Sequence, residues 1–204
     1  MKIVWHGHSC FSVETAAGTA VFDPYIDGMV PGLAPLSLTA DAVFCSHAHD
    51  DHNAVDKVKL SGREPGFAVE EIPCFHDDVR GLRRGKNTIR ILCAEDMRVA
   101  HLGDLGHRLR GEALEKLRGV DALMIPVGGF FTIDAATAKK IVDDISPRVV
   151  LPMHYRLGGM GFAQIAELSA FTSLFDHVIE YDTNTLDLTA ETCAQIAVLR
   201  YVHE

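Results

Sequence analysis

Short apolar runs, rich in β-branched and aromatic residues, alternate along most of the chain with breaks that contain Gly, Pro, Asn or Asp. Runs of this kind are typical of β-strands. The predicted strands are Lys2–Trp5, Phe11–Glu14, Thr19–Phe22, Ala42–Cys45, Ala68–Pro73, Thr88–Ala94, Met97–Leu102, Ala122–Ile125, Val149–Leu151, Val178–Tyr181 and Ala194–Tyr201. Glu95 and Asp96 lie between two of these runs and predict a hairpin turn.

Helical periodicity appears in the second half of the chain. It predicts helices over Glu112–Leu117, Ala135–Ile145 and Phe162–Leu174. Asp134 suits the N-cap of the second helix, and Pro147 follows its end. Because helices fall between strands, we expect sheets covered by helices, an α/β layered fold. Asp27–Leu38, which contains glycines and prolines, is expected to be an irregular loop lying over a site.

Composition is that of an ordinary globular protein. Of the 204 residues, 48% are hydrophobic and 23% are charged, and no linker or low-complexity segment interrupts the chain. A chain of this length can bury a sizeable core within one unit. We therefore expect a single domain over residues 1–204.

Charge, cysteine content and the absence of long apolar segments indicate which binding partners and which cellular location to expect. The net charge of −9 argues against a protein that binds the nucleic-acid backbone. No basic leader precedes an apolar run at the N-terminus, and no segment approaches the roughly 18 apolar residues of a membrane span. The five cysteines form no C-x-x-C pair and are expected to be reduced, with Cys10, Cys45 and Cys74 in the core. We expect a cytoplasmic protein that binds neither nucleic acid nor membranes.

The most informative segment follows the predicted strand Ala42–Cys45. Five side chains there can bind metal or orient a ligand: His47, His49, Asp50, Asp51 and His52. Imidazole and carboxylate suit zinc, manganese and iron. The alternative is a polar loop with solvated histidines, but three histidines and two aspartates directly after an apolar strand favour a metal site.

Further ligands are needed to complete a site for two ions. His76, Asp104 and His154 each stand just after an apolar run, where loops held by a rigid sheet build binding sites. Taken singly, each is equally well explained as an ordinary polar strand end. Their repeated position after strands is what makes them candidates.

With these residues in this order, the chain resembles the metallo-β-lactamase superfamily. Ser46–His52 has the H-x-H-x-D-H form of its binuclear hydrolases, and His76, Asp104 and His154 follow in the same order. Within the superfamily the chain is most similar to small bacterial metal-dependent hydrolases related to ascorbate-phosphate lactonase. The segments that carry this likeness include Trp5–Ser9, Asp23-Pro24, Arg84–Thr88, His101–Gly106, Pro126–Gly129 and Pro152–His154.

The resemblance implies an αββα sandwich with metals at one edge of the two sheets. It implies that the first metal is held by His47, His49 and His76. It assigns the second metal to Asp51, His52 and His154, with Asp104 bridging both. Spacing alone pointed to the same residues but did not divide them between the ions.

A binuclear site of this kind would use a metal-bridging hydroxide as nucleophile. We expect Asp51 to orient that nucleophile as well as to bind metal. His8, in a Gly-His-Ser turn, either contacts substrate or donates a proton as a catalytic residue, or is a structural turn. Asp50 and Asp77 either orient ligand imidazoles or face solvent.

Other polar and aromatic residues near these segments each have two possible roles. The basic residues Arg80, Arg83, Arg84 and Lys86 either attract an anionic substrate or form a solvated loop. Phe130 and Phe131 either form a wall of the pocket or belong to the core. No pattern supports a role for His6, His107, His177 or His203.

The function that these observations favour is metal-dependent hydrolysis of a small ester, lactone or phosphoester. A secreted β-lactamase would need an export signal, and superfamily diiron enzymes have an acidic residue at the position of His49 and a fused flavin module. The cofactors would be two divalent ions; zinc is expected, with manganese, iron and nickel also compatible. The partner is a small-molecule substrate, anionic if the basic residues contact it. The alternative is a non-catalytic metal-binding or regulatory protein of the same fold.

Overall fold

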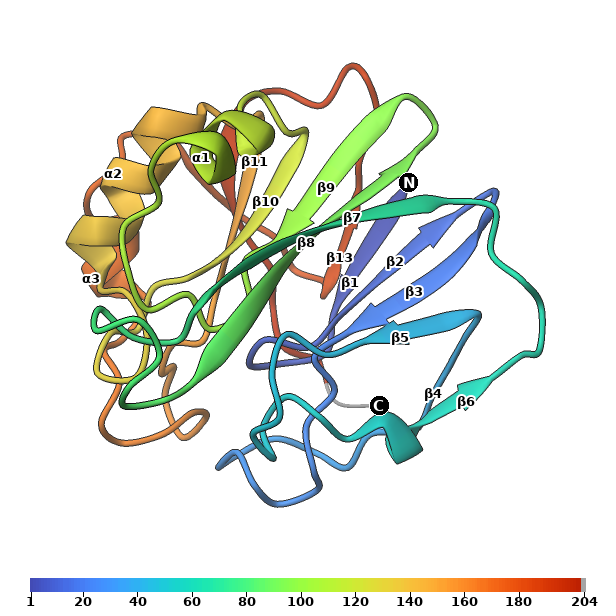
Figure 1. Ribbon diagram of the computed structural model, residues 1–204, viewed down its shortest axis with the longest axis horizontal. Coiled ribbons are helices and arrows are strands. Elements are labelled where there is room, and N and C mark those ends of the chain that lie inside the picture. The colour runs from blue at the N-terminus through green and yellow to red at the C-terminus, as the bar shows by residue number, and fades with distance from the viewer. Residues whose placement is uncertain (203–204) are drawn as a thin grey trace.

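Two facing β-sheets form the centre of the computed structural model, which describes residues 1–202 (Figure 1). The smaller sheet has the strand order β13-β1-β2-β3-β5. Its strands are β1 (Lys2–Trp5), β2 (Phe11–Thr15), β3 (Gly18–Phe22), β5 (Ala42–Phe44) and β13 (Thr185–Asp187).

The larger sheet has the order β12-β14-β11-β10-β9-β8-β7. Its strands are β7 (Ala68–Phe75), β8 (Lys86–Ala94), β9 (Met97–His101), β10 (Ala122–Pro126), β11 (Val149–Met153), β12 (Val178–Glu180) and β14 (Gln195–Val198). Glu95 and Asp96 form the hairpin turn between β8 and β9, with positive φ angles of 53° and 56°. All of the predicted strands are present, with ends shifted by a few residues.

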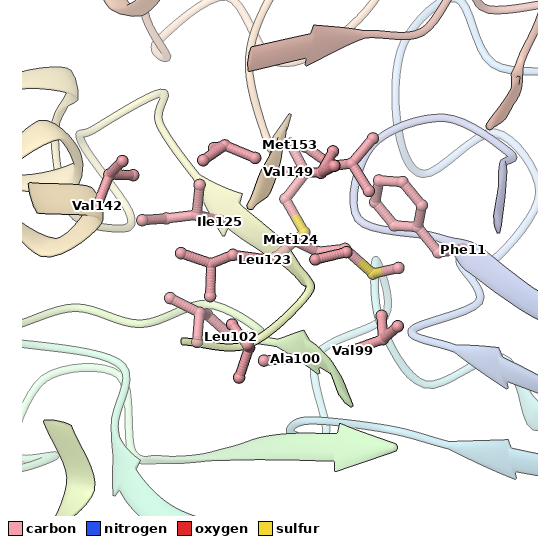
Figure 2. Close-up of a cluster of buried hydrophobic side chains, with 14 of the residues drawn as sticks. Phe11, Val99, Ala100, Leu102, Leu123, Met124, Ile125, Val142, Val149 and Met153 are labelled. Carbon is pink, nitrogen blue, oxygen red and sulfur yellow. The ribbon is translucent and has the colours of Figure 1, made fainter. Parts of the chain in front are cut away.

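Strand alternation determines which side chains enter the core between the sheets. On β2, Phe11 and Val13 point toward the larger sheet, and Ser12 between them points away. Figure 2 shows Phe11 and Met124 on one side of β10, with Ile125 on the other side facing Val142 of a helix. The central strands β10 and β11 of the larger sheet are therefore buried on both faces, as their continuous apolar sequences require.

Three α-helices cover the outer face of the larger sheet (Figure 1): α1 (Glu112–Leu117), α2 (Ala135–Ile145) and α3 (Ser169–Thr172). On α2 the buried side chains repeat with helical spacing at Ala138, Ile141, Val142 and Ile145. The N-cap prediction is confirmed, because Asp134 Oδ1 accepts a hydrogen bond of 2.8 Å from the Thr137 N–H.

The predicted helix over Phe162–Leu174 is much shorter in the structure. Only Ser169–Thr172 is α-helical. The preceding backbone hydrogen-bonds to neighbouring loops instead: the Ala166 N–H donates to Gly128 O, and the Arg156 N–H donates to Ala166 O. Tertiary contacts thus override the helical periodicity there.

The outer face of the smaller sheet is covered differently. The predicted irregular loop packs there with the small sheet of β4 (Leu38–Ala40) and β6 (Val58–Leu60), which follows the 3₁₀ turn η1 (Val55–Lys57). Together they enclose a second apolar cluster of Cys10, Val21, Tyr25, Val30, Ala40 and Val58. The predicted sandwich of two facing sheets is confirmed, but within residues 1–202 α-helices cover only the larger sheet, and loop, the 3₁₀ turn and short strands cover the smaller one.

Four short elements were not predicted, namely β4, β6, β13 and the 3₁₀ turn η1. Each has three residues, too few to show an alternating pattern. The described part of the chain contains no helix long and apolar enough to span a membrane.

We predict that Leu123→Ala destabilises the fold by about 2–5 kcal/mol, because Leu123 is fully buried on β10 and its truncation leaves a cavity. The matched control is Leu82→Ala, since Leu82 is 87% exposed, and it should change stability by less than about 0.5 kcal/mol. Urea unfolding followed by circular dichroism measures both. Equal midpoints for the two variants would contradict this description of the core.

Candidate metal centre

Strand direction brings the candidate residues to one edge of the sandwich. In the smaller sheet β1, β3 and β5 run in the same direction, because β2 is antiparallel to both β1 and β3, and β3 is parallel to β5. In the larger sheet β7, β9, β10 and β11 likewise run together. The C-terminal ends of all these strands therefore carry the loops that build the site.

The structure brings together all seven residues that the sequence nominated as ligands. His47, His49 and His76 each offer one atom, and these atoms lie within 4.8 Å of one another. A second group with the same spacing contains Asp51, His52 and His154. His8 also belongs to this second group, although spacing had not nominated it as a ligand.

Asp104 lies between the two groups. Its Oδ2 is 3.2 Å from His76 Nε2 of the first group and 3.2 Å from His154 Nε2 of the second. Its Oδ1 is 3.2 Å from His52 Nε2. This central position is the one that a bridging carboxylate would occupy.

Several polar atoms of the cluster are buried without a hydrogen-bond partner, which fits two divalent ions. They are His47 Nε2, His52 Nε2, His154 Nε2 and Asp104 Oδ1. Buried polar atoms are normally hydrogen-bonded, so a convergent group of unpartnered ones is suited to binding cations. Neutral imidazole nitrogens and carboxylate oxygens are suitable ligands for zinc and related ions.

Asp23 holds two of the imidazoles, a role that the strand-end reasoning missed. Its Oδ2 accepts hydrogen bonds from His52 Nδ1 at 2.8 Å and from the Ser46 hydroxyl at 2.6 Å. Ser46 Oγ lies 2.9 Å from His47 Nδ1, which donates to it because the hydroxyl proton points to Asp23. With protons on both Nδ1 atoms, the Nε2 lone pairs of His47 and His52 face the cluster. Asp23 directly follows β3, so the same rule that found Asp104 could have found it.

Asn87 and two glycines position the loops that carry Asp104 and His76. The Asn87 Oδ1 accepts the Asp104 N–H at 3.0 Å, and its amide donates to Leu102 O at 2.9 Å. A Cβ at Gly103 would lie 2.4 Å from Asn87 Oδ1, and one at Gly106 would lie 2.3 Å from the His76 carbonyl carbon. The close contact between these loops thus requires glycine.

Backbone strain is concentrated at this edge. The non-glycine residues with positive φ include His8 at 49°, Asp23 at 47°, Phe130 at 59° and His154 at 53°. Such conformations cost about 1–3 kcal/mol each and persist only where surrounding contacts impose them. The strain fixes the direction of side chains that face the cluster.

Burial and close charges shift the ionisation of the cluster. Burial lowers the pKa of His47 to about 3, and His52 beside it acts in the same direction. Burial opposes a charge on His52, but Asp104 raises the pKa of His52 well above its usual value. Burial would also raise the pKa of Asp104, yet His154 and His52 hold it well below its usual range. Asp104 is therefore a carboxylate that needs positive charge around it.

His8 lies fully inside the site. Its Nε2 is 3.2 Å from Asp51 Oδ2, and its ring centre is 4.2 Å from that of His154. Burial, followed by the effect of His154, lowers the pKa of His8 to about 4. Its side chain is fully buried and does not line the cleft above the cluster, so the structure favours a contact with Asp51 over the contact with substrate that the sequence left open.

Neither Asp50 nor Asp77 hydrogen-bonds to a candidate ligand imidazole. Asp50 is exposed at the mouth of the site. Asp77 is buried, and its carboxylate accepts backbone N–H groups from Val79, Gly81, Arg83 and Arg84 at 2.7–2.9 Å. Asp77 thus organises the loop that follows His76.

The histidines without a predicted role lie outside the cluster. His6 Nε2 is 2.9 Å from Ser12 Oγ, His107 Nε2 accepts the Phe75 N–H, and His177 is exposed. His203 lies outside the described residues.

A cleft of about 440 Å³ opens directly over the cluster. Polar ligand residues form its floor, while Met29, Phe131 and Phe162 contribute apolar walls. Of the basic residues in the 80–86 segment, only Arg84 lines the cleft; Arg80, Arg83 and Lys86 are exposed. Phe131 lines the cleft, whereas Phe130 is 63% exposed, so neither belongs to the core.

Comparison with known proteins gives concordant matches. Residues 2–154 match the family described as the beta-lactamase superfamily domain. A UPF0173 protein of Pyrococcus abyssi is 31% identical over 191 residues, covering 80% of this chain and 88% of that protein. A UPF0173 metal-dependent hydrolase of Thermoplasma acidophilum is 27% identical over 187 residues, covering 76% and 83%. The crystal structure of a proposed Zn-dependent hydrolase of the metallo-beta-lactamase superfamily from Thermotoga maritima has a TM-score of 0.76 and 32% identity, covering 97% of each chain.

We predict that Asp23→Asn weakens metal binding by about 10–100-fold, because an amide cannot accept from His52 Nδ1 and Ser46 as a carboxylate does. Asparagine has the same shape and tolerates positive φ, so the fold should be kept. Competition with a chromophoric chelator measures the affinity.

The matched control is Asp41→Asn. Asp41 also follows a strand and accepts from a backbone N–H, that of Thr19, and from a hydroxyl, that of Ser61, but it lies outside the cluster. It should leave metal affinity unchanged. Equal losses in the two variants would mean that Asp23 acts only through general stability.

Proposed function

Because this chain belongs to the beta-lactamase superfamily and, within it, to the UPF0173 metal-dependent hydrolases, we propose that it uses two divalent metal ions to hydrolyse a small ester, lactone or phosphoester. His47, His49 and His76 hold the first ion. The second would be held by Asp51, His52 and His154, and Asp104, which lies between the two groups of residues, would compensate charge on both ions.

The observation that carries this proposal is the convergence of unpartnered imidazole nitrogens on both sides of Asp104. A cluster built only for stability would pair these atoms with donors and acceptors of its own. The two groups of ligand atoms, one on each side of a shared carboxylate, match a site for two ions rather than one.

Zinc is the ion that we propose. The donors are nitrogen and oxygen, and among residues 1–202 no cysteine belongs to the groups of ligand atoms. This set is also compatible with manganese, iron and nickel. The similar Thermotoga maritima chain, described as Zn-dependent, supports zinc.

The residues around the ions have separable tasks. When bound, the ions supply a hydroxide nucleophile near neutral pH and stabilise negative charge on the oxygen of the scissile group. Asp51, held by its contact with His8, orients the attacking water. The His8 side chain is fully buried and does not line the cleft, so we propose that it positions Asp51 rather than contacting the substrate. Phe131 and Phe162 pack against the apolar part of the substrate and exclude water.

We predict that removal of metal abolishes hydrolysis and lowers the melting temperature, since the buried carboxylate is then uncompensated. The assay is a panel of generic phosphodiester, lactone, ester and thioester substrates, measured before chelation, after it, and after the return of zinc or manganese. Turnover that needs metal and is lost in His49→Ala supports the proposal. Bound metal with no turnover on any substrate class, unchanged in His49→Ala, would instead favour a non-catalytic metal-binding protein.

We predict that Asp104→Ala loses at least one equivalent of metal, because Asp104 contacts ligand atoms of both groups. Elemental analysis of the purified protein gives the stoichiometry. Asp50→Ala is the matched control, since Asp50 is an exposed carboxylate in the same cleft and should keep the full metal content. Two equivalents retained in Asp104→Ala would rule out the bridging role.

A further inference from the structure

We propose that Arg84 binds an anionic group of the substrate, so that the substrate is a small ester or lactone that carries a carboxylate or phosphate group. The class of substrate rests on the hydrolase function proposed above. The anion site itself rests on the side chains around Arg84.

Within residues 1–202, Arg84 has no acidic partner; Arg80 on the same loop is likewise unpaired, but it is exposed and does not line the cleft, whereas three other arginines are paired. Arg83 pairs with Asp78, Arg108 with Asp144, and Arg156 with Glu167. Among the described residues the Arg84 side chain makes no ion pair and no hydrogen bond. Its guanidinium lies over the ring of Phe131 instead, with Cζ 5.6 Å from the ring centre. The hydrogen-bond donors of the guanidinium are therefore free.

The backbone of Arg84 is held firmly, although its side chain is free to bind. Its N–H donates to Asp77 Oδ2 at 2.8 Å, and the same carboxylate fastens Val79, Gly81 and Arg83 of the loop. The side chain is half-buried against Phe131. A guanidinium fixed in this way loses little conformational freedom when it binds a ligand.

Arg84 is placed next to the proposed reaction centre. Arg84 and Phe131 line the same cleft as His49, His76 and His154. The Phe131 ring centre is 6.4 Å from that of His154, so one phenyl ring separates the guanidinium from a metal ligand. A substrate whose scissile bond lies at the ions can reach Arg84 with a group a few bonds away.

The chemistry of the cleft favours an anion over a neutral or cationic group. Two divalent ions and a bound hydroxide would balance the three carboxylates that line the cleft, Asp50, Asp51 and Asp104, so that Arg84 leaves the site with a net positive charge. The planar guanidinium matches carboxylate and phosphate oxygens with two parallel hydrogen bonds. Met29 and Phe162 offer apolar surface for the rest of the molecule.

The test uses the metal-loaded full chain and three 4-nitrophenyl esters: the neutral butyrate, the monosuccinate and the 3-phosphonopropanoate. Arg84→Met keeps an apolar contact with Phe131 and removes the charge. We expect this variant to lower the ratio of kcat/KM for an anionic ester to that for the butyrate by about 10–100-fold, mainly through KM. Arg84→Lys should restore part of the ratio, because it keeps a charge but not the planar fork.

The control is Arg83→Met, at an exposed and ion-paired neighbour, and it should leave the ratio at the wild-type value. The ester that loses more in Arg84→Met, succinate or phosphonopropanoate, identifies the preferred anion. A ratio that does not change in Arg84→Met overturns the proposal and leaves Arg84 a purely structural contact of Phe131.

A separate measurement distinguishes failure of this inference from failure of the hydrolase proposal. If wild-type protein hydrolyses no ester, lactone or phosphodiester, the hydrolase proposal fails. Calorimetric titration with succinate and with 3-phosphonopropanoate then tests the anion site alone. Binding at least about tenfold weaker in Arg84→Met than in wild type supports the site, and equal binding overturns it.

Discussion

A carboxylate buried away from water must be surrounded by positive charge or by hydrogen-bond donors. In this structure the carboxylate that imposes this requirement on the site is that of Asp104. Its oxygens lie 3.2 Å from the imidazoles of His52, His76 and His154, which come from both sheets. Without ions, only a proton on a neighbouring imidazole could compensate this charge, and although Asp104 raises the pKa of His52, burial opposes the charged form of His52. Divalent ions remove that conflict, and this explains why the ligand set is most simply understood with metal bound.

Much of this arrangement could be predicted from the sequence, because the candidate ligands are polar residues that directly follow apolar strands. The H-x-H-x-D-H segment, His76, Asp104 and His154 all come directly after apolar runs, and parallel strands bring such positions to one edge. The strands longer than three residues were all found, since their apolar runs are unbroken. The division of ligands between two ions came only from the family resemblance.

What could not be predicted depends on contacts between distant segments. Asp23 is an ordinary Asp-Pro strand end in the sequence, and only the folded chain brings it to Ser46 and His52. Most of the segment Phe162–Leu174 is not helical as expected, because the backbone of Ala166 forms hydrogen bonds with Gly128 and Arg156 instead of within a helix. The basic residues 80–86 looked alike in the sequence, and the folding of the loop around Asp77 selects Arg84 alone to line the cleft.

The pairing of β1 with both β2 and β13 has a consequence for how the protein forms during synthesis. The smaller sheet is completed only when Thr185–Asp187 reaches the N-terminal strand, and the ion-binding edge needs His154 to meet His8. Contacts between residues this far apart in the chain form slowly. During synthesis the early candidate ligands, from His47 to Asp104, therefore precede both His154 and the strand that completes the smaller sheet, so the full cluster can assemble only after most of the chain has been made.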